Sequence, residues 1–157
     1  MTDQFTVDHI KKQPLFADLA PEFVDFLAQA ASRVKLKADK VVFRHGDRAD
    51  KFYVLVSGRV TVEIPALYGP ALEVQALSSN EALGWSWLIP PFKWNFQARA
   101  ETDCELLEFD GKELLLLCDR EPRFGYELVK RFAALMSERL NAARNTMMAQ
   151  WTPAGFA

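Results

Sequence analysis

The chain has 157 residues, of which 50% are hydrophobic and 25% are charged, and its formal net charge is −2. This length suits one globular domain with a substantial core and leaves no room for a second full domain. The small negative charge excludes a general electrostatic attraction to nucleic acid or to an anionic membrane, so either partner would need a specific local site.

Two further observations bear on where in the cell the protein is located. Cys104 and Cys118 are too few for a disulfide framework or a thiolate metal cage, and as buried thiols they suit a reducing environment. The start of the chain lacks the pattern of a signal peptide, and no apolar run reaches the roughly 18 residues that a membrane span needs. We therefore expect a soluble cytoplasmic protein without a membrane partner.

Residues 1–31 are predicted to hold two short helices. The first, over 3–12, ends before Pro14, because the residue that precedes a proline is disfavoured in the helical conformation. The second begins at Pro21, since proline is tolerated in the first turn of a helix. Its apolar residues recur at helical spacing and are expected to pack on a sheet: Phe23, Phe26, Leu27 and Ala30.

Residues 33–109 show short apolar runs, several with a period of two, which indicates β-strands. Gly46 and Gly58 mark turns between strands, because glycine readily adopts positive φ. The expected strands are 34–36, 41–43, 52–56, 60–64, 72–77, 95–100 and 105–109. Seven or eight short strands at close spacing, with no long helix between them, favour an antiparallel jelly roll or barrel over a parallel sheet.

Residues 110–148 are predicted to be helical again. A short helix follows Asp110, and Pro122 separates it from an amphipathic helix over 124–148 of about seven turns. The apolar residues of the long helix recur in steps of three and four: Phe124, Leu128, Phe132, Leu135, Leu140 and Met147. The charged residues are expected to fall mostly on other faces: Lys130, Arg131, Glu138, Arg139 and Arg144.

The long helix also suggests an assembly. It extends past a compact barrel of this size, so part of its apolar face needs a partner, and the same helix of a second copy is the simplest one. We therefore expect a homodimer through the helix 124–148. The alternative is that the helix folds back onto its own barrel.

Three segments of the chain resemble the cyclic nucleotide-binding domain family. They are LFADL before a helix, VFRHGDRADKFYVLVSGRV, and RAETDCELL, at residues 15–19, 42–60 and 99–107. The spacing from Gly46 and Asp47 to Gly58 is the most specific part, and the resemblance covers residues 15–139. It implies a mainly β fold with flanking helices: an antiparallel β-roll, which is a double-stranded β-helix or jelly roll.

The resemblance also implies how the chain is organised. A single cyclic nucleotide-binding-like domain is expected over 1–157. Its parts are N-terminal helices over 1–31, the β-roll over 33–109, C-terminal helices over 110–148 and a tail over 149–157.

Residues 80–99 carry three of the four tryptophans and a Pro-Pro pair, which is typical of a pocket wall rather than an idle loop. In ligand-binding members of the family, the phosphate-binding cassette has a Gly-Glu pair, whose Glu binds the ribose hydroxyl, and a later Arg that pairs with the cyclic phosphate. The resemblance places Trp85 at the position of that Glu and Trp94 at that of the Arg, with Asn95 after it. Loss of a charged fork is worth about 2–5 kcal/mol of specific binding, so weak binding of cyclic AMP and cyclic GMP is expected.

The candidate ligand-binding residues are Gly84, Trp85, Ser86, Trp87, Lys93, Trp94 and Asn95. Lys93 and the backbone amides near 84–87 could hold a cyclic nucleotide or another small anion. The indoles could instead stack on a different small molecule. In the remaining alternative, the tryptophans close the pocket and the protein is a ligand-free interaction scaffold with the same fold.

No pattern in the chain indicates catalysis. The Gly-x-Ser-x-Gly elbow, the Walker loop and the metalloprotease motif are all missing. His45 with Asp47 and Asp50 nearby is much more typical of a turn than of a metal site. We therefore expect neither an enzyme nor a metal centre.

Catabolite-activator-type members continue from the long helix into a DNA-reading winged helix, whereas this sequence stops within about ten residues of that helix. Direct DNA binding is therefore not expected, and the output would come from an unknown partner protein or from dimer geometry. In the mechanism that the resemblance implies, a ligand at the cassette, residues 84–95, moves the helix 124–148 about a hinge at 121–122.

Overall fold

The computed structural model describes residues 3–150, except for the side chain of residue 150. The helices are α1 (Gln4–Lys12), α2 (Pro21–Gln29), α3 (Gly111–Arg120) and α4 (Pro122–Gln150), with short 3-10 helices η1 (Pro14–Phe16) and η2 (Ser86–Leu88). The strands are β1 (Ala31–Leu36), β2 (Val41–Phe43), β3 (Lys51–Ser57), β4 (Val60–Ile64), β5 (Leu72–Leu77), β6 (Ala82–Leu83), β7 (Gln97–Ala100) and β8 (Cys104–Asp110). All but two residues of the predicted tail lie outside the described residues.

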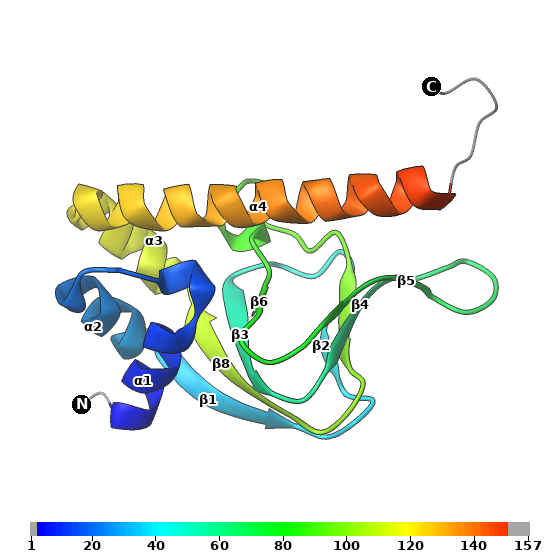
Figure 1. Ribbon diagram of the computed structural model, residues 1–157, viewed down its shortest axis with the longest axis horizontal. Helices are drawn as coiled ribbons and strands as arrows, with labels where there is room; N and C mark the ends of the chain where they lie inside the picture. The colour runs from blue at the N-terminus through cyan, green and yellow to red at the C-terminus, as the bar shows by residue number, and fades with distance from the viewer. Residues whose placement is uncertain (1–2, 151–157) are drawn as a thin grey trace.

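The eight strands form two four-stranded antiparallel sheets, in the orders β1-β8-β3-β6 and β2-β7-β4-β5. The fold class that the sequence predicts, an antiparallel β-roll with N-terminal helices and a long C-terminal helix, is confirmed (Figure 1). The turn at Gly58 joins β3 to β4, where φ is +95°. The strand boundaries differ in part from the prediction: β1 begins at Ala31 rather than at residue 34, and the short β6 was not predicted.

The N-terminal helices gather at one end of the roll, beside α3 (Figure 1). Helix α1 begins at Asp3, whose carboxylate accepts a hydrogen bond of 2.6 Å from the backbone N–H of Thr6. Such a cap satisfies one of the free amides of the first turn. Ile10 of α1 and Leu27 of α2 are fully buried, so both helices pack through the apolar faces that the sequence indicated.

Two hydrophobic clusters hold the molecule together. The first joins the N-terminal helices, α3 and α4 to one sheet. At its centre the ring of Phe52 stacks on those of Trp87 and Phe109, and Phe132 meets Phe52 and Trp87 edge to face. The second lies between the sheets, and Phe43, Tyr53 and Trp94 are its aromatic members. A sheet face that is apolar must be buried against another layer, and the helices provide that layer for the first cluster.

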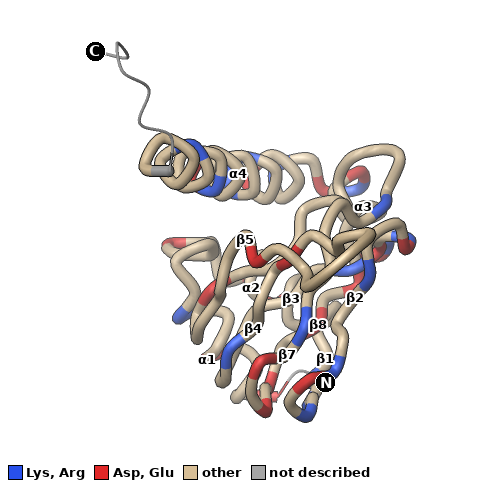
Figure 2. The backbone as a smooth tube through the Cα atoms, turned by 90° about the vertical axis from the view of Figure 1, so that its right-hand side faces the viewer, with Lys and Arg blue, Asp and Glu red and all other residues tan. Residues whose placement is uncertain are grey.

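Helix α4 runs along the whole molecule and forms a separate layer beside the strands (Figures 1 and 2). Pro122 is the first residue of α4, and the helix continues two residues past the predicted end at 148. Phe124, Leu128 and Phe132 are fully buried against this same chain. The first half of α4 therefore packs on its own domain, and its apolar face is not available to a second copy.

Two arginines of α4 do not lie where the sequence placed them. Both Arg131 and Arg139 were expected to fall away from the apolar face. Arg131 instead donates hydrogen bonds to the carbonyls of Leu15 and Ala17, at 3.1 and 2.6 Å, and Arg139 is half-buried against the roll. The prediction was wrong for these two residues, because the guanidinium can reach backbone acceptors while the aliphatic stem packs on apolar groups.

Within residues 3–150, no helix is both long enough and apolar enough to cross a bilayer.

Candidate functional site

A cavity of about 340 Å³ lies between the roll and the second half of α4. Its lining residues come from strands, the cassette and the helix: Phe43, Val62, Val74, Gln75, Leu83, Gly84, Trp85, Ser86, Trp94, Asn95, Phe96, Met136, Arg139, Leu140, Ala142, Ala143 and Thr146. Most of these side chains are apolar, and the volume is at the lower end of what small-molecule sites occupy. An occupant of this cavity would contact the cassette and α4 at once.

The structure brings five of the seven candidate residues to this cavity. Gly84, Trp85, Ser86, Trp94 and Asn95 line it. The side chains of Trp85 and Ser86 are half-buried, whereas Asn95 is exposed. These residues thus form one wall, opposite the helix.

Trp94 is the most deeply placed residue of that wall, with 5% of its surface exposed. Its ring stacks on Phe43 with 3.8 Å between centroids and 9° between planes. Gly84 has φ of +98°, and a Cβ added there would lie 2.5 Å from Cη2 of Trp94. A glycine is therefore needed at 84 both for its backbone conformation and for the approach of the indole.

The other two candidates, Trp87 and Lys93, do not line the cavity. Trp87 is buried in the first hydrophobic cluster, where its ring centroid lies 5.1 Å from Phe52 and 5.2 Å from Phe132. Its indole N–H has no hydrogen-bond partner among the described residues. Lys93 is exposed and forms an isolated antiparallel bridge with Arg48.

Twelve of the residues that line the cavity were not among the sequence candidates, and Arg139 is the one of them that carries a charge. Its Nη2 donates to the carbonyl of Ala82 at 2.6 Å, and its Nη1 lies 3.5 Å from Oε1 of Gln75. Burial lowers the pKa of the guanidinium, and Glu81 and Glu138 oppose that shift. The available signal was the helical spacing: the residues of α4 at 132, 136, 139, 143 and 146 follow steps of four and three, which puts them on one face.

The charge of the cavity lining comes from Arg139. Among the described residues that line the cavity, Arg139 is the only one with a charged side chain. Within residues 3–150, no carboxylate lies within ion-pair distance of its guanidinium. The cavity is therefore mostly apolar, with one positive group on the helix side and four uncharged polar side chains: Gln75, Ser86, Asn95 and Thr146.

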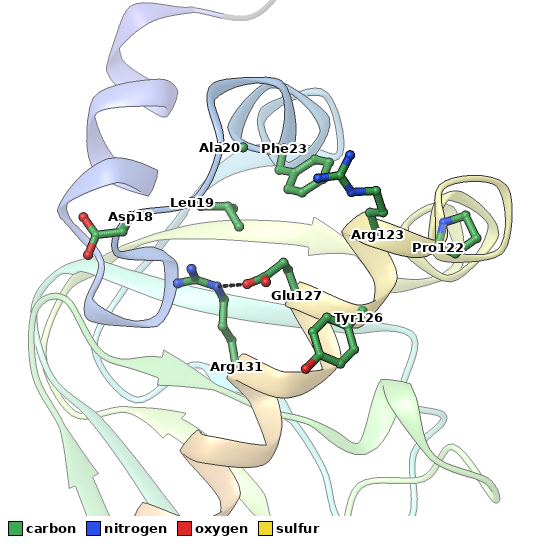
Figure 3. A pocket seen from close by; sticks show the side chains of 9 residues that line it. All are labelled: Asp18, Leu19, Ala20, Phe23, Pro122, Arg123, Tyr126, Glu127 and Arg131. Carbon is green, nitrogen blue, oxygen red and sulfur yellow. Dashed lines mark ion pairs between the residues drawn. The ribbon is translucent and has the colours of Figure 1, made fainter.

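A second cavity, of about 480 Å³, lies between the segment after η1 and the start of α4 (Figure 3). Two of its four charged side chains, Glu127 and Arg131, are engaged with the protein itself. Nε of Arg131 lies 3.6 Å from Glu127, and Nη1 of the same residue bonds to Leu15 and Ala17. Figure 3 shows this ion pair between Arg131 and Glu127 as a dashed line. We interpret the arrangement as a clamp between the N-terminal segment and α4 rather than as a ligand site.

The predicted hinge at 121–122 coincides with the break between α3 and α4. At the end of α3, the backbone N–H of Glu121 donates a hydrogen bond of 2.7 Å to the carbonyl of Leu117. Helix α4 begins at the next residue, Pro122. Gly125 lies directly against Cys118, where an added Cβ would be 3.0 Å away. The two helices thus pack closely at this break.

Comparisons with known proteins agree with this geometry. The family model for the cyclic nucleotide-binding domain matches residues 33–121. A cyclic AMP receptor protein of Thermus thermophilus is 31% identical over 134 residues, which are 85% of this chain and 60% of that protein. The chain therefore spans less than two thirds of the length of this relative.

Solved structures give the same result. The catabolite activator protein of Thermus thermophilus matches with a TM-score of 0.71 and 29% identity, over 88% of this chain and 63% of that one. A cyclic nucleotide-binding domain from Methylobacillus flagellatus has a TM-score of 0.80 over 96% of this chain and 85% of that one. At 16% identity, the second match shows the fold alone.

Proposed function

Because the chain belongs to the cyclic nucleotide-binding domain family, we propose that it is a non-catalytic regulatory module that senses a small ligand in the cavity between the roll and α4. The observation that carries this proposal is the position of the cavity, whose walls are the cassette on one side and α4 on the other. A ligand there can shift the position of α4 if it binds the two positions of the helix with different affinities.

The ligand is not an ordinary cyclic nucleotide in this proposal. Trp85 and Trp94 occupy the positions at which the family resemblance expects a carboxylate and a guanidinium. An indole offers one N–H donor and no charge, and the ring of Trp94 is engaged in stacking on Phe43. Cyclic AMP and cyclic GMP should therefore bind more weakly by about 2–5 kcal/mol than in members with both charged groups.

A second candidate function is a ligand-free interaction scaffold. The burial of Trp94 in the cluster between the sheets favours it, because that indole fills space within the roll. Under this alternative, Trp85 would close the remaining cavity and the protein would act only through its surfaces. The open volume beside α4 favours the sensor over the scaffold.

The proposed assembly is a homodimer through the second half of α4, which passes its signal to an output protein. Met147 and Met148 are 60% and 47% exposed there, unlike the buried apolar residues of the first half. The hairpin of β4 and β5 extends from the roll on the same side (Figure 1) and exposes Leu67 and Tyr68 at its tip. Exposed apolar groups of this kind are typical of interaction surfaces.

The proposed compartment is the cytoplasm. Cys104 is buried, Cys118 is half-buried, and both are free. Burial, with the nearby Asp119, raises the pKa of the Cys118 thiol, which keeps it protonated and unreactive at neutral pH. Free thiols of this kind suit a reducing environment.

The test is a thermal-melting screen of the protein with a chemically diverse set of small molecules that includes cyclic AMP and cyclic GMP. A ligand at about 100 times its dissociation constant adds roughly 2.7 kcal/mol to stability, which raises the melting temperature by several degrees. Ala143→Trp should block the cavity from its exposed helix side. Ala134→Trp adds the same side chain to α4 at an exposed position that does not line the cavity.

We expect stabilising compounds outside the cyclic nucleotides, whose effect is lost in Ala143→Trp and kept in Ala134→Trp. A screen without any stabilising compound would favour the scaffold. A large shift with cyclic AMP would show that the altered cassette still binds its family ligand.

A further inference from the structure

Arg139 is a charged group in an apolar cavity. Its guanidinium has five N–H donors, of which one donates to Ala82 and another makes a long contact with Gln75. The remaining donors have no acceptor among the described residues, and no carboxylate there pairs with the charge. Glu81 and Glu138 act on this half-buried guanidinium only from beyond ion-pair distance. Partial burial of a cation without a contacting counter-charge is unfavourable, so an anion in the cavity would satisfy this group.

The surroundings of Arg139 restrict the rest of the ligand. Phe43, Trp85, Trp94 and Phe96 present aromatic side chains to the cavity from the roll, and Met136 contributes a thioether from α4. Aromatic walls favour a flat apolar body that can stack or meet a ring edge, and methionine adapts to such shapes. The volume of about 340 Å³ limits this body to a compact group.

The charge of the ligand is restricted as well. One guanidinium faces the cavity, and Lys93, the other cation near the cassette, lies on the exterior. A dianion would keep one negative charge without a partner in an apolar space, which is unfavourable. A planar carboxylate matches the two parallel N–H groups that an arginine offers.

We infer that the cavity binds a compact, planar and apolar monoanion, such as an aromatic carboxylate, whose charged group pairs with Arg139 of α4. The inference rests on the proposed function and makes it more specific. The charge of the ligand is recognised by the helix instead of by the cassette. An anion held this way bridges α4 to the aromatic wall of the roll, so its binding links the two elements directly.

The test is calorimetric titration with 2-naphthoate and with its neutral analogue 2-naphthamide. The two probes share the same apolar body and differ in the charged group. We expect naphthoate to bind the parent protein about tenfold or more tightly than naphthamide. Arg139→Gln should remove this preference, because it weakens naphthoate binding by about tenfold or more relative to naphthamide binding.

Arg144→Gln is the matched control, because Arg144 is an exposed arginine of the same helix that does not line the cavity. It should keep the parent preference. Arg139→Lys retains the charge without the planar fork and should keep part of it. Melting curves of each variant identify any that is unfolded, and Arg139→Lys then provides the test.

Equal affinity for both probes in the parent, or an unchanged preference in Arg139→Gln, would overturn the inference. Cavity binding of naphthamide alone would leave the sensor proposal intact while rejecting the anion. Failure of both probes in the calorimeter would reject the planar apolar class, and the broader screen with Ala143→Trp would still decide whether the cavity binds ligands.

Discussion

In this site, Gly84 determines where the side chain of Trp94 can lie. The indole lies flat on Phe43 on one side, and on the other it touches the Cα face of Gly84, which has no side chain. Any larger residue at 84 would push Trp94 out of the cluster between the sheets. Since Trp94 also lines the cavity, this pair determines the shape of the candidate site.

We predict that Gly84→Ala destabilises the protein by more than Gly46→Ala does. Both glycines have positive φ, +98° and +88°, so both substitutions carry a similar backbone strain. Only at 84 would the new methyl group meet a ring, whereas at 46 nothing lies within 4 Å. The additional loss at 84 should be about 1–3 kcal/mol. Urea denaturation of both variants measures it, and equal losses would mean that Trp94 moves freely.

The candidate residues illustrate what the sequence can and cannot place. The family resemblance located the cassette, and Trp85, Trp94 and Asn95 do line one cavity. It could not tell that Trp87 packs in the neighbouring cluster, because alternate residues of a short 3-10 turn face different sides and the turn itself was not predicted. Arg139 was missed since a charge on an amphipathic helix is by default assigned to solvent.

At the scale of elements, α4 is anchored by its first half. Phe132 is fully buried and meets Phe52 and Trp87 edge to face, with centroids 5.0 and 5.2 Å apart. Arg131 adds the hydrogen bonds to the carbonyls before α2. The second half lies over the cavity and exposes its methionines. This difference allows the second half to respond to a ligand while the first half stays docked.

Phe132→Ala should therefore cost about 3–5 kcal/mol of the free energy of unfolding, the usual range for removal of a buried phenyl ring. Val129→Ala is the control, because Val129 lies on the same helix and is 51% exposed. Its effect should stay within about 0.5 kcal/mol. Chemical denaturation gives both values, and a cost near zero at 132 would show that α4 is not docked on the roll.

Helix α1 provides a prediction about pH. The hydrogen bonds from Thr6 to Asp3 lower the pKa of this carboxyl below its ordinary value of 3.8. A lowered pKa in the folded state stabilises the protein above the ordinary pKa, and this contribution is lost as the pH falls through the folded-state value. Asp3→Ala should therefore be less stable than the parent at pH 7, and the difference should shrink below pH 3.8.

Thermal melting of parent and Asp3→Ala across this pH range checks the prediction. Asp8→Ala serves as the control, since Asp8 lies inside the same helix. A difference between parent and Asp3→Ala that stays constant down to the lowest pH would assign the effect to something other than the charged cap.

Most elements could be predicted from the sequence because each one depends on local patterns. The period of two in 60–64 and the glycine turn before it correspond to β4 and its hairpin, and Pro122 does begin the long helix. The resemblance implied a β-roll but no order of strands within the two sheets. Pairing of β1 with β8 joins residues about 70 positions apart, and no local pattern encodes such contacts.

In the whole molecule, the described surfaces on which we expect a second copy to bind are the end of α4 and the β4–β5 hairpin. We predict that the protein sediments as a dimer, because Met147 and Met148 near the end of α4 are 60% and 47% exposed. Replacing both with Glu should give a folded monomer. Ser137→Glu, which adds a charge at an exposed position of α4 without removing an apolar side chain, should remain dimeric.

Analytical ultracentrifugation distinguishes these outcomes. A parent protein that is monomeric at high micromolar concentration would rule out the dimer. A dimer that persists in the double methionine variant would place the interface elsewhere, with the exposed Leu67 and Tyr68 of the hairpin as the next residues to change.

If occupation of the cavity is transmitted to α4, then 2-naphthoate should slow hydrogen exchange in that helix. At saturating naphthoate we expect slower exchange for amides of the cassette and for residues 136–146 of α4, with no such effect in Arg139→Gln. If naphthoate saturates the protein in calorimetry while the exchange of α4 stays unchanged, the cavity is a binding site that does not act on the helix, and the regulatory account is wrong.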